Sequence, residues 1–245
     1  MVRNVDQESR KRAVLSATIN RYIKEAAPVA SEDIAEEFDL SSATIRNIFK
    51  ELEEAGLLTH PYTSGGRVPT RKGYRYYVDF LVSQMVLLEQ EKEFIGNKYK
   101  SQNRRLEDIL EKTSGLVSAI THYTGIVAFL DEEQRLFYNG ISLVLELPEF
   151  QDAGQIRRLV RMMENKQRLL DIINRDFTEK VKVYIGDELD CDDIEGCSMA
   201  VSRYSLNNRP LGRIAVLGPM RMEYGHIIPA LEYVSDVLTE TLGEI

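Results

Sequence analysis

The order of four short elements near the N-terminus constrains the fold more than any other feature of this sequence. Ser31 is predicted to be the N-cap of a helix, and residues 39–40 make a tight connection to a second helix. Ser41 or Ser42 is a suitable N-cap for that second helix, which is predicted to continue to about Ala55. A hairpin with glycines at its tip follows. Helix, tight turn, helix and hairpin in this order are typical of a winged helix-turn-helix.

A longer helix is predicted ahead of these elements, from about Glu8 to Glu25. Apolar residues recur on one of its sides at helical spacing, namely Leu15, Ile19, Tyr22 and Ile23. Pro28 ends this helix, because the residue before a proline is pushed out of the helical region. The N-terminal unit is therefore expected to contain three helices and a hairpin.

The helix that begins at Ser41 or Ser42 has two distinct faces. At about 100° per residue, its apolar residues gather on one side, namely Ile45, Ile48, Phe49, Leu52 and Ala55. Small polar residues and long hydrogen-bond donors gather on the other side, namely Ser42, Ala43, Arg46, Asn47 and Lys50. In a major groove, Arg pairs with guanine, Asn pairs with adenine, and Ser or Thr holds phosphate. The alternative for this helix alone is an ordinary solvated face.

The hairpin that follows is basic. Its strands are predicted at residues 57–60 and 67–68, and no acidic residue occurs between Glu54 and Asp79. Arginine and lysine side chains in this interval can contact phosphate or a minor groove, although a hairpin can also merely cover the core. The polar helix face and the basic hairpin together favour DNA binding. The candidate DNA-binding residues are Ser41, Ser42, Thr44, Arg46, Asn47, Lys50, Thr63, Ser64, Arg67, Arg71 and Lys72.

Charge is divided unevenly along the chain. Residues 1–77 hold 12 Lys and Arg against 11 Asp and Glu, whereas residues 78–245 hold 19 against 28. The acidic part is expected to repel DNA, so binding is assigned to the N-terminal part. No apolar run approaches the roughly 18 residues of a membrane span, and no secretory signal is visible. With only two cysteines, a reduced, cytoplasmic compartment is the simplest expectation.

The remainder of the chain mixes helices and strands. An amphipathic helix is predicted around residues 106–120, and helices are also predicted at about Ala153–Ile173 and Tyr224–Thr241. Strands are predicted at residues 125–130, 134–138, 141–147, 180–185, 198–204 and 211–217. The returns between these strands are too short for regular βαβ crossovers. The pattern therefore predicts an α+β domain.

No catalytic or metal-binding group is apparent in the sequence. The three histidines, His60, His122 and His226, are scattered and lack the spacing of metal ligands. Cys191 and Cys197 lack C-x-x-C spacing and are interpreted as free structural thiols. The acidic residues 187–195 do not follow the order of a calcium-binding loop. We therefore expect a protein without cofactor, metal or enzymatic activity.

Four segments resemble one bacterial family, the heat-inducible transcription repressor HrcA. The most specific is SSATIRNIFKELEEAGLLTHPYTSGGRVPTRKGYRYYVD, residues 41–79. GPMRMEYGHIIPALEYVSDVLTETL at residues 218–242 agrees with it, as do YNGISLVLELPEF at 138–150 and VKVYIGDEL at 181–189. The resemblance implies a dimeric repressor of chaperone operons that binds an inverted-repeat operator and is released on heat stress. It also implies a GAF-like C-terminal domain and dependence on the chaperonin.

Two departures from the family pattern are visible. Members of the family are about a hundred residues longer, and the missing length is placed near residues 124–133, where the family carries an inserted dimerisation segment. In addition, Arg71 stands where the family often has an acidic residue, which makes the hairpin region more basic. A homodimer is still expected. Its surfaces would come from the apolar residues Tyr76, Tyr77, Phe80, Leu81 and Met85, and from Ile228, Leu231, Val234 and Leu238.

Three domains are predicted from these patterns. Residues 1–77 form a winged-helix DNA-binding domain, residues 78–104 a helical connector, and residues 105–245 a GAF-like domain for regulation and dimerisation. Two other functions remain compatible with the residues. One is a winged-helix regulator of other genes whose C-terminal domain binds a small ligand. The other is a protein-interaction module that reuses the winged-helix fold without binding DNA.

Overall fold

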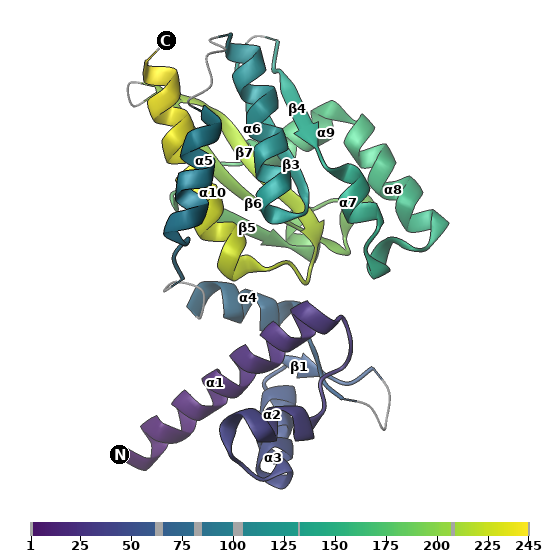
Figure 1. Cartoon of the computed structure of the whole chain (residues 1–245). Helices are drawn as coiled ribbons and strands as arrows, with labels where there is room; N and C mark the ends of the chain where they lie inside the picture. Colours follow the sequence, from purple (N-terminus) through teal and green to yellow (C-terminus); the bar gives the residue numbers. More distant parts are fainter. Residues whose placement is uncertain are drawn as a thin grey trace. The chain divides into compact units, whose positions relative to one another are not determined.

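Two compact units make up the chain, residues 1–84 and residues 85–245. The structure is a computed structural model (Figure 1). It describes residues 2–61, 66–80, 85–99, 105–131, 133–206 and 209–244, with side chains from Gln7 onward. None of the described helices combines the length and the apolar character needed to cross a membrane.

The first unit is built from four helices and one small hairpin. In chain order these elements are α1 (Val2–Glu25), α2 (Ser31–Phe38), α3 (Ser42–Glu54), β1 (Leu58–Thr59), β2 (Val68–Pro69) and α4 (Arg71–Phe80). The three predicted helices and the hairpin are confirmed, although α1 begins earlier than expected; α4 is a fourth helix, which begins at Arg71, ahead of the predicted helical connector. α1 buries Val14, Leu15 and Ile19 completely or almost completely against α3, α4 and the hairpin.

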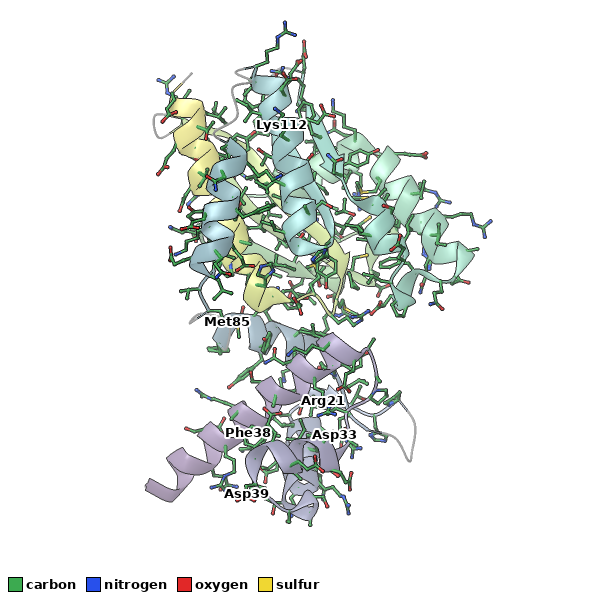
Figure 2. All side chains as sticks on the ribbon, in the orientation of Figure 1. Arg21, Asp33, Phe38, Asp39, Met85 and Lys112 are labelled. Atoms are coloured by element: carbon green, nitrogen blue, oxygen red, sulfur yellow. The ribbon has the colours of Figure 1, made fainter. Side chains whose placement is uncertain are left out.

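The start of α2 differs by one residue from the prediction. Ala30, and not Ser31, is the N-cap, and its backbone N–H donates to the Asp33 carboxylate over 3.1 Å. Asp33 also forms an ion pair with Arg21, whose terminal nitrogen lies 3.4 Å from the carboxylate, and this pair joins α2 to α1. Both side chains are labelled in Figure 2. Because the Asp33 carboxylate accepts the N–H of the capping residue, the Ser31 hydroxyl can accept a hydrogen bond from Arg46.

The hairpin has the register of a small winged-helix sheet. β1 and β2 pair antiparallel, with Leu58 opposite Pro69 and Thr59 opposite Val68. Val29, in the segment before α2, bridges to Arg67 through two backbone hydrogen bonds of 2.8 and 2.9 Å. The wing is thereby joined to the chain that enters α2. The predicted contact residues Thr63 and Ser64 lie outside the described residues.

The second unit is a five-stranded sheet with helices on both sides. Its helices are α5 (Glu89–Tyr99), α6 (Leu106–Thr121), α7 (Ile141–Leu145), α8 (Ala153–Glu164), α9 (Lys166–Ile173) and α10 (Tyr224–Gly243). Its strands are β3 (Thr124–Phe129), β4 (Leu136–Asn139), β5 (Val181–Ile185), β6 (Cys197–Leu206) and β7 (Arg209–Pro219). Short 3-10 turns lie at η1 (Pro148–Phe150), η2 (Gly186–Leu189) and η3 (Asp192–Ile194).

All neighbouring strands of this sheet are antiparallel, in the order β4-β3-β7-β6-β5. α6 and α10 pack on one face, and α5 packs on both of these helices (Figure 1). The segment between α9 and β5 reaches the other face of the sheet, where Phe177 contacts the side chain of Arg213. This is the α+β class that the sequence predicts, and it fits the GAF-like fold implied by the resemblance.

Two predicted elements of this unit are wrong. Residues 141–147 were expected to form a strand, but Ile141–Leu145 is the helix α7. A short apolar run does not distinguish a strand from a buried helical turn by periodicity alone. The single helix predicted at Ala153–Ile173 is divided at Asn165, whose side chain accepts the backbone N–H of Arg168 over 3.1 Å and so caps α9.

The residues from α4 to α5, which include most of the connector predicted at residues 78–104, are divided between the two compact units. Tyr74 and Tyr77 are buried within the first unit, and the Tyr77 hydroxyl donates to Asn20 over 2.5 Å. In the second unit, Leu87 and Ile95 are buried, and α5 packs on α6 and α10. The division into three domains at residues 77 and 104 stays a prediction.

We expect Gly125→Ala to destabilise the second unit by about 1–3 kcal/mol, because overpacking forces neighbouring atoms apart. A Cβ at Gly125 would press on the backbone carbonyl of Ser114 and lie 2.8 Å from the backbone nitrogen of Ser118 in α6. Gly196→Ala is the matched control, since nothing lies within 4 Å of its Cβ position. Urea unfolding followed by circular dichroism measures both variants. Equal stability of the two would contradict the close approach of α6 to β3.

Candidate nucleic-acid interface

The helix α3 is fixed by its apolar side. Ile45, Phe49 and Leu52 are buried against the rest of the unit, and α3 contacts both α1 and α2. The Ser41 side chain caps the helix: its Oγ accepts the backbone N–H of Thr44 over 3.1 Å and lies 2.8 Å from the Thr44 hydroxyl. The capping role predicted for Ser41 is thereby confirmed. Gly56 leaves the helix with a φ of 71°, a conformation that glycine adopts readily.

The opposite side of α3 faces solvent. Ala43, Arg46, Asn47 and Lys50 are exposed, and Ser42 is half-buried at the start of the helix. Three of the predicted contact residues, Arg46, Asn47 and Lys50, therefore share one accessible face, whereas Thr44 is half-buried at the start of the helix. At its N-terminal end, the free backbone N–H groups of the first turn and the helix dipole favour an anion such as phosphate.

Arg46 of α3 forms hydrogen bonds with two residues of α2. Its Nε donates to Ser31 Oγ over 3.2 Å, and a terminal nitrogen donates to Glu32 Oε1 over 2.9 Å. This hydrogen bond from Arg46 lowers the pKa of the Glu32 carboxyl, helped by the backbone of Glu32 and the Ser31 hydroxyl. The guanidinium nevertheless stays well exposed, with 63% of its side-chain surface accessible. Glu32 therefore orients Arg46 without hiding it.

Further along the face, Asn47 and Lys50 extend outward. Lys50 has a long ion pair of 3.9 Å with Glu54, one turn later in the same helix. Exposed pairs at this spacing contribute little, so the Lys50 ammonium can change partner easily. Asn47 offers one acceptor and two donors on the same exposed side.

The wing is tied to α3 by a shared carboxylate. Glu53 Oε1 lies 2.9 Å from Arg67 Nε and 2.7 Å from His60 Nδ1. Both Glu53 and Arg67 are mostly buried, with 19% and 26% of their side-chain surface accessible. Arg67 was predicted to contact DNA; the structure places it at the base of the hairpin, where it pairs with Glu53 of α3.

The other two basic residues of this region differ from each other. The Lys72 ammonium donates to the backbone carbonyl of Ala55 over 2.8 Å, at the C-terminal end of α3. A cation at that end satisfies a free carbonyl and complements the helix dipole. Arg71 is half-buried at the start of α4. Lys72 thus has a structural partner that the sequence did not reveal.

Three partners of the interface were not found in the sequence. Ser31, Glu32 and Glu53 each hold a basic residue that was predicted to contact DNA, namely Arg46 for the first two and Arg67 for the third. Glu32 and Arg46 are fourteen residues apart on different helices. No periodicity or motif pairs them, so only the packing of α2 on α3 identifies this contact.

The histidines and cysteines that were considered as metal ligands or reactive groups have structural roles. His60 contacts Glu53, His226 lies 2.8 Å from Glu91, and His122 ends α6 with a φ of 59°. Cys191 and Cys197 are buried free thiols, and burial raises the pKa of Cys197 to about 12. Within the described part of the chain, no three His, Cys, Asp or Glu side chains are grouped so as to hold a metal ion.

Comparison with known families gives two matches along the chain. Residues 7–79 match the winged helix-turn-helix transcription repressor domain described as HrcA DNA-binding, and residues 127–228 match the HrcA protein C-terminal domain. The first match contains the whole of α2, α3, the wing and most of α4. The second contains most of the five-stranded sheet and the start of α10.

Similar proteins extend over nearly the full chain. A protein from Carboxydothermus hydrogenoformans, named heat-inducible transcription repressor HrcA, is 29% identical and covers 96% of this chain and 98% of its own. A protein of the same name from Pelotomaculum thermopropionicum is 27% identical, with 97% of each chain covered. The first comparison runs over 336 residues, whereas this chain has 245. The relative therefore carries internal residues that have no counterpart here, which agrees with the prediction that this chain is shorter than other members of the family.

The fold itself is also found in a solved structure. A crystal structure described as that of a hypothetical protein at 2.2 Å resolution has a TM-score of 0.80, with 19% identity and coverage of 96% of this chain and 98% of that chain. At this identity the likeness concerns the fold alone. Both family matches and the named relatives agree with one another and with the motifs of residues 41–79. The chain belongs to the HrcA family of heat-inducible transcription repressors, as a member that lacks part of the family's internal length.

Proposed function

We propose that this protein is a non-enzymatic transcription repressor of heat-shock genes, and that α3 reads an operator in the major groove of DNA. The observation that carries this proposal is the exposed polar face of α3 on a rigid winged-helix unit. A helix of this size enters the major groove, and Arg and Asn are the side chains that pair with guanine and adenine there. The names of the relatives supply the class of gene that is regulated.

In this proposal the residues of α3 divide into two roles. Ser41, Ser42 and Thr44 lie at the N-terminal end of the helix, where hydroxyls and backbone N–H groups hold a phosphate. Arg46 and Asn47 lie one turn further and contact base edges, and Lys50 supports them along the same side. Phosphate contacts set the position of the helix, whereas base contacts give the specificity.

We expect Arg46→Ala or Asn47→Ala to cost about 1–3 kcal/mol of binding free energy on the cognate operator, because each removes a base contact. The same variants should lose much less affinity for a random duplex of equal length. Fluorescence anisotropy with both duplexes, at one fixed salt concentration, measures the difference. An equal loss on the two duplexes would show that these residues contact only the backbone.

Glu32 competes with DNA for Arg46, so we expect Glu32→Gln to bind the operator a few-fold more tightly than the unaltered protein. The variant removes the carboxylate that holds the guanidinium and also removes a negative charge near the phosphates. Glu37→Gln is the matched control, since it removes the same charge from an exposed position of α2. Binding isotherms of the two variants separate the specific release of Arg46 from general electrostatics. Equal gains in both would exclude a role for the Glu32–Arg46 pair.

The wing is proposed to contact phosphate or a minor groove through Arg67, Arg71 and Lys72, with Thr63 and Ser64 at its tip. Each phosphate contact that is removed should reduce the slope of log K against log salt by about one. Alanine variants of the three basic residues are measured singly and together, with thermal unfolding as a check because Lys72 also caps α3. A folded triple variant with unchanged affinity and slope would remove the wing from the interface.

Repression is further proposed to need a homodimer on an inverted repeat, and to end on heating as the DNA-competent fold is lost. Two recognition helices related by a two-fold axis then contact successive major grooves. Loss of operator binding in the same temperature range as cooperative unfolding of the purified protein tests the thermal part. Dependence on the chaperonin is proposed from the family alone, and refolding of heated protein with and without chaperonin tests it.

Several of the side chains proposed from the sequence for the dimer interface are buried. Leu231, Val234 and Leu238 of α10 are buried within their own unit, and so is Tyr77 of α4. These side chains are therefore not available to a second chain. Large apolar side chains are exposed along the segment where the first unit ends and the second begins, namely Phe80, Met85, Val86, Leu88 and Phe94, whereas Leu81 lies outside the described residues. A stable two-fold interface there would bury about 1,200–2,000 Å² in total.

We expect Val86→Glu with Leu88→Glu to convert a dimer into a monomer, since four carboxylates would then meet in an apolar interface. Sedimentation velocity at micromolar concentration measures the mass, and operator binding should lose its cooperativity. Leu130→Glu is the control, because this exposed leucine lies at the end of β3, outside the segment. A double variant that stays dimeric would place the interface elsewhere, and an unaltered protein that is monomeric would contradict the two-fold arrangement.

A further inference from the structure

Two arginines face each other across neighbouring strands of the second unit. Arg203 of β6 and Arg213 of β7 are paired in the antiparallel register. Side chains of directly opposite residues lie on the same face of a sheet with Cβ atoms about 4.5–5.5 Å apart, and like charges in this arrangement are destabilising. The pair lies on the face opposite α6, because Gly125, which contacts α6, is paired with Val216 and residues 213 and 216 alternate in direction.

Arg213 is buried without adequate partners. Only 7% of its surface is accessible, and its Nε has no hydrogen-bond partner among the described residues. One terminal nitrogen donates to the carbonyl of its neighbour Gly212 over a long 3.4 Å. A buried N–H group without a partner costs free energy, and a charged one costs more. An arginine in this state is poorly explained as a structural residue.

The surroundings of the pair are positive and aromatic. The ring of Phe177 lies 5.4 Å from the Arg213 guanidinium and 6.0 Å from that of Arg203, and Arg203 also donates to the carbonyl of Thr178 over 3.2 Å. Arg175 lies over Tyr184 on the same face of the sheet, and Lys182 of β5 is paired with Glu179. These four cations stand beside two carboxylates, Asp176 and Glu179, within a part of the chain that is otherwise strongly acidic.

No carboxylate in the described part of the chain forms an ion pair with Arg203 or Arg213. Burial, and then the neighbouring charge of Arg203, lower the pKa of the Arg213 guanidinium, while the exposed Asp176 opposes this only in part. A second arginine would ordinarily be an unfavourable neighbour for a buried one. The two guanidinium groups therefore carry positive charge that no ion pair among the described residues balances.

We propose that Arg203 and Arg213 form a binding site for a small oxyanion, the carboxylate or phosphate group of a small molecule. Guanidinium groups present planar forks of N–H donors that match both kinds of oxyanion, often through two parallel hydrogen bonds. The ring of Phe177 lies close to both guanidinium groups, and the buried Nε of Arg213 has no hydrogen-bond partner among the described residues, so this N–H can donate to the anion. Arg203 is exposed, so the ligand reaches the pair from that side.

Titration of the purified full-length protein with inorganic phosphate and with acetate, against chloride at constant ionic strength, tests the site. Isothermal calorimetry gives the affinity, and a saturating anion should raise the unfolding temperature of the second unit by about 2–4 °C. Tighter binding of phosphate assigns the site to a phosphate group, and tighter binding of acetate assigns it to a carboxylate. Failure of both anions to bind at tens of millimolar would overturn the proposal.

Three variants make the test specific to the pair. Arg213→Met should lose at least tenfold in affinity and yet unfold in chloride at the same temperature as the unaltered protein or above it, because an apolar side chain replaces an unpaired buried charge. Arg203→Gln, at an exposed position, should fold normally and bind several-fold more weakly. Arg157→Gln, on the exposed side of α8, is the control and should bind normally. Unchanged affinity in Arg203→Gln, or a large loss of stability in Arg213→Met without loss of binding, would show that the pair is structural.

Discussion

The burial of one side of α3 is the constraint on which the DNA-binding unit depends. Ile45, Phe49 and Leu52 fill the space between α1, α2 and the hairpin, so the rotation of α3 about its axis is fixed. Once that rotation is fixed, the side that carries Arg46 and Asn47 has to face outward. Ser41 then determines where the helix begins, and hence which backbone N–H groups are free at its end. Packing and capping together create the surface that the proposed function uses.

The sequence predicts this surface well because its causes are local. The spacing of the apolar residues in α3 requires only helical geometry, and Gly56 and Ser41 act on residues next to them. The partners of the basic side chains are different. Glu32 reaches Arg46, and Lys72 reaches the carbonyl of Ala55, only because distant segments pack together. The sequence gives the charge of these side chains but not their partners. It therefore could not show whether Lys72 contacts DNA or caps the C-terminal end of α3.

In the second unit, the pairing of strands determines features that the local sequence pattern does not predict. The apolar run at residues 141–147 has the composition of a strand, yet β4 already forms the edge of the sheet beside β3, and the run folds as α7. β3 and β4, which are neighbours along the chain, pair antiparallel at this edge of the sheet. The same pairing sets Arg203 opposite Arg213. Ten residues separate them along the chain, and only the register of β6 and β7 brings them together.

Charges in the first unit are largely neutralised within the unit itself. Arg46 is held by Glu32, Arg67 by Glu53, and Lys11 by Glu8 and Glu51, whose hydrogen bonds raise the pKa of that lysine. In the proposed function, binding to DNA therefore exchanges one set of partners for another, and it does not simply neutralise free cations. An exchange of this kind releases fewer counterions per basic residue than contact by free cations would. Cations that are already paired within the protein attract DNA of every sequence less strongly. Discrimination between sequences then depends on the geometry of the base contacts.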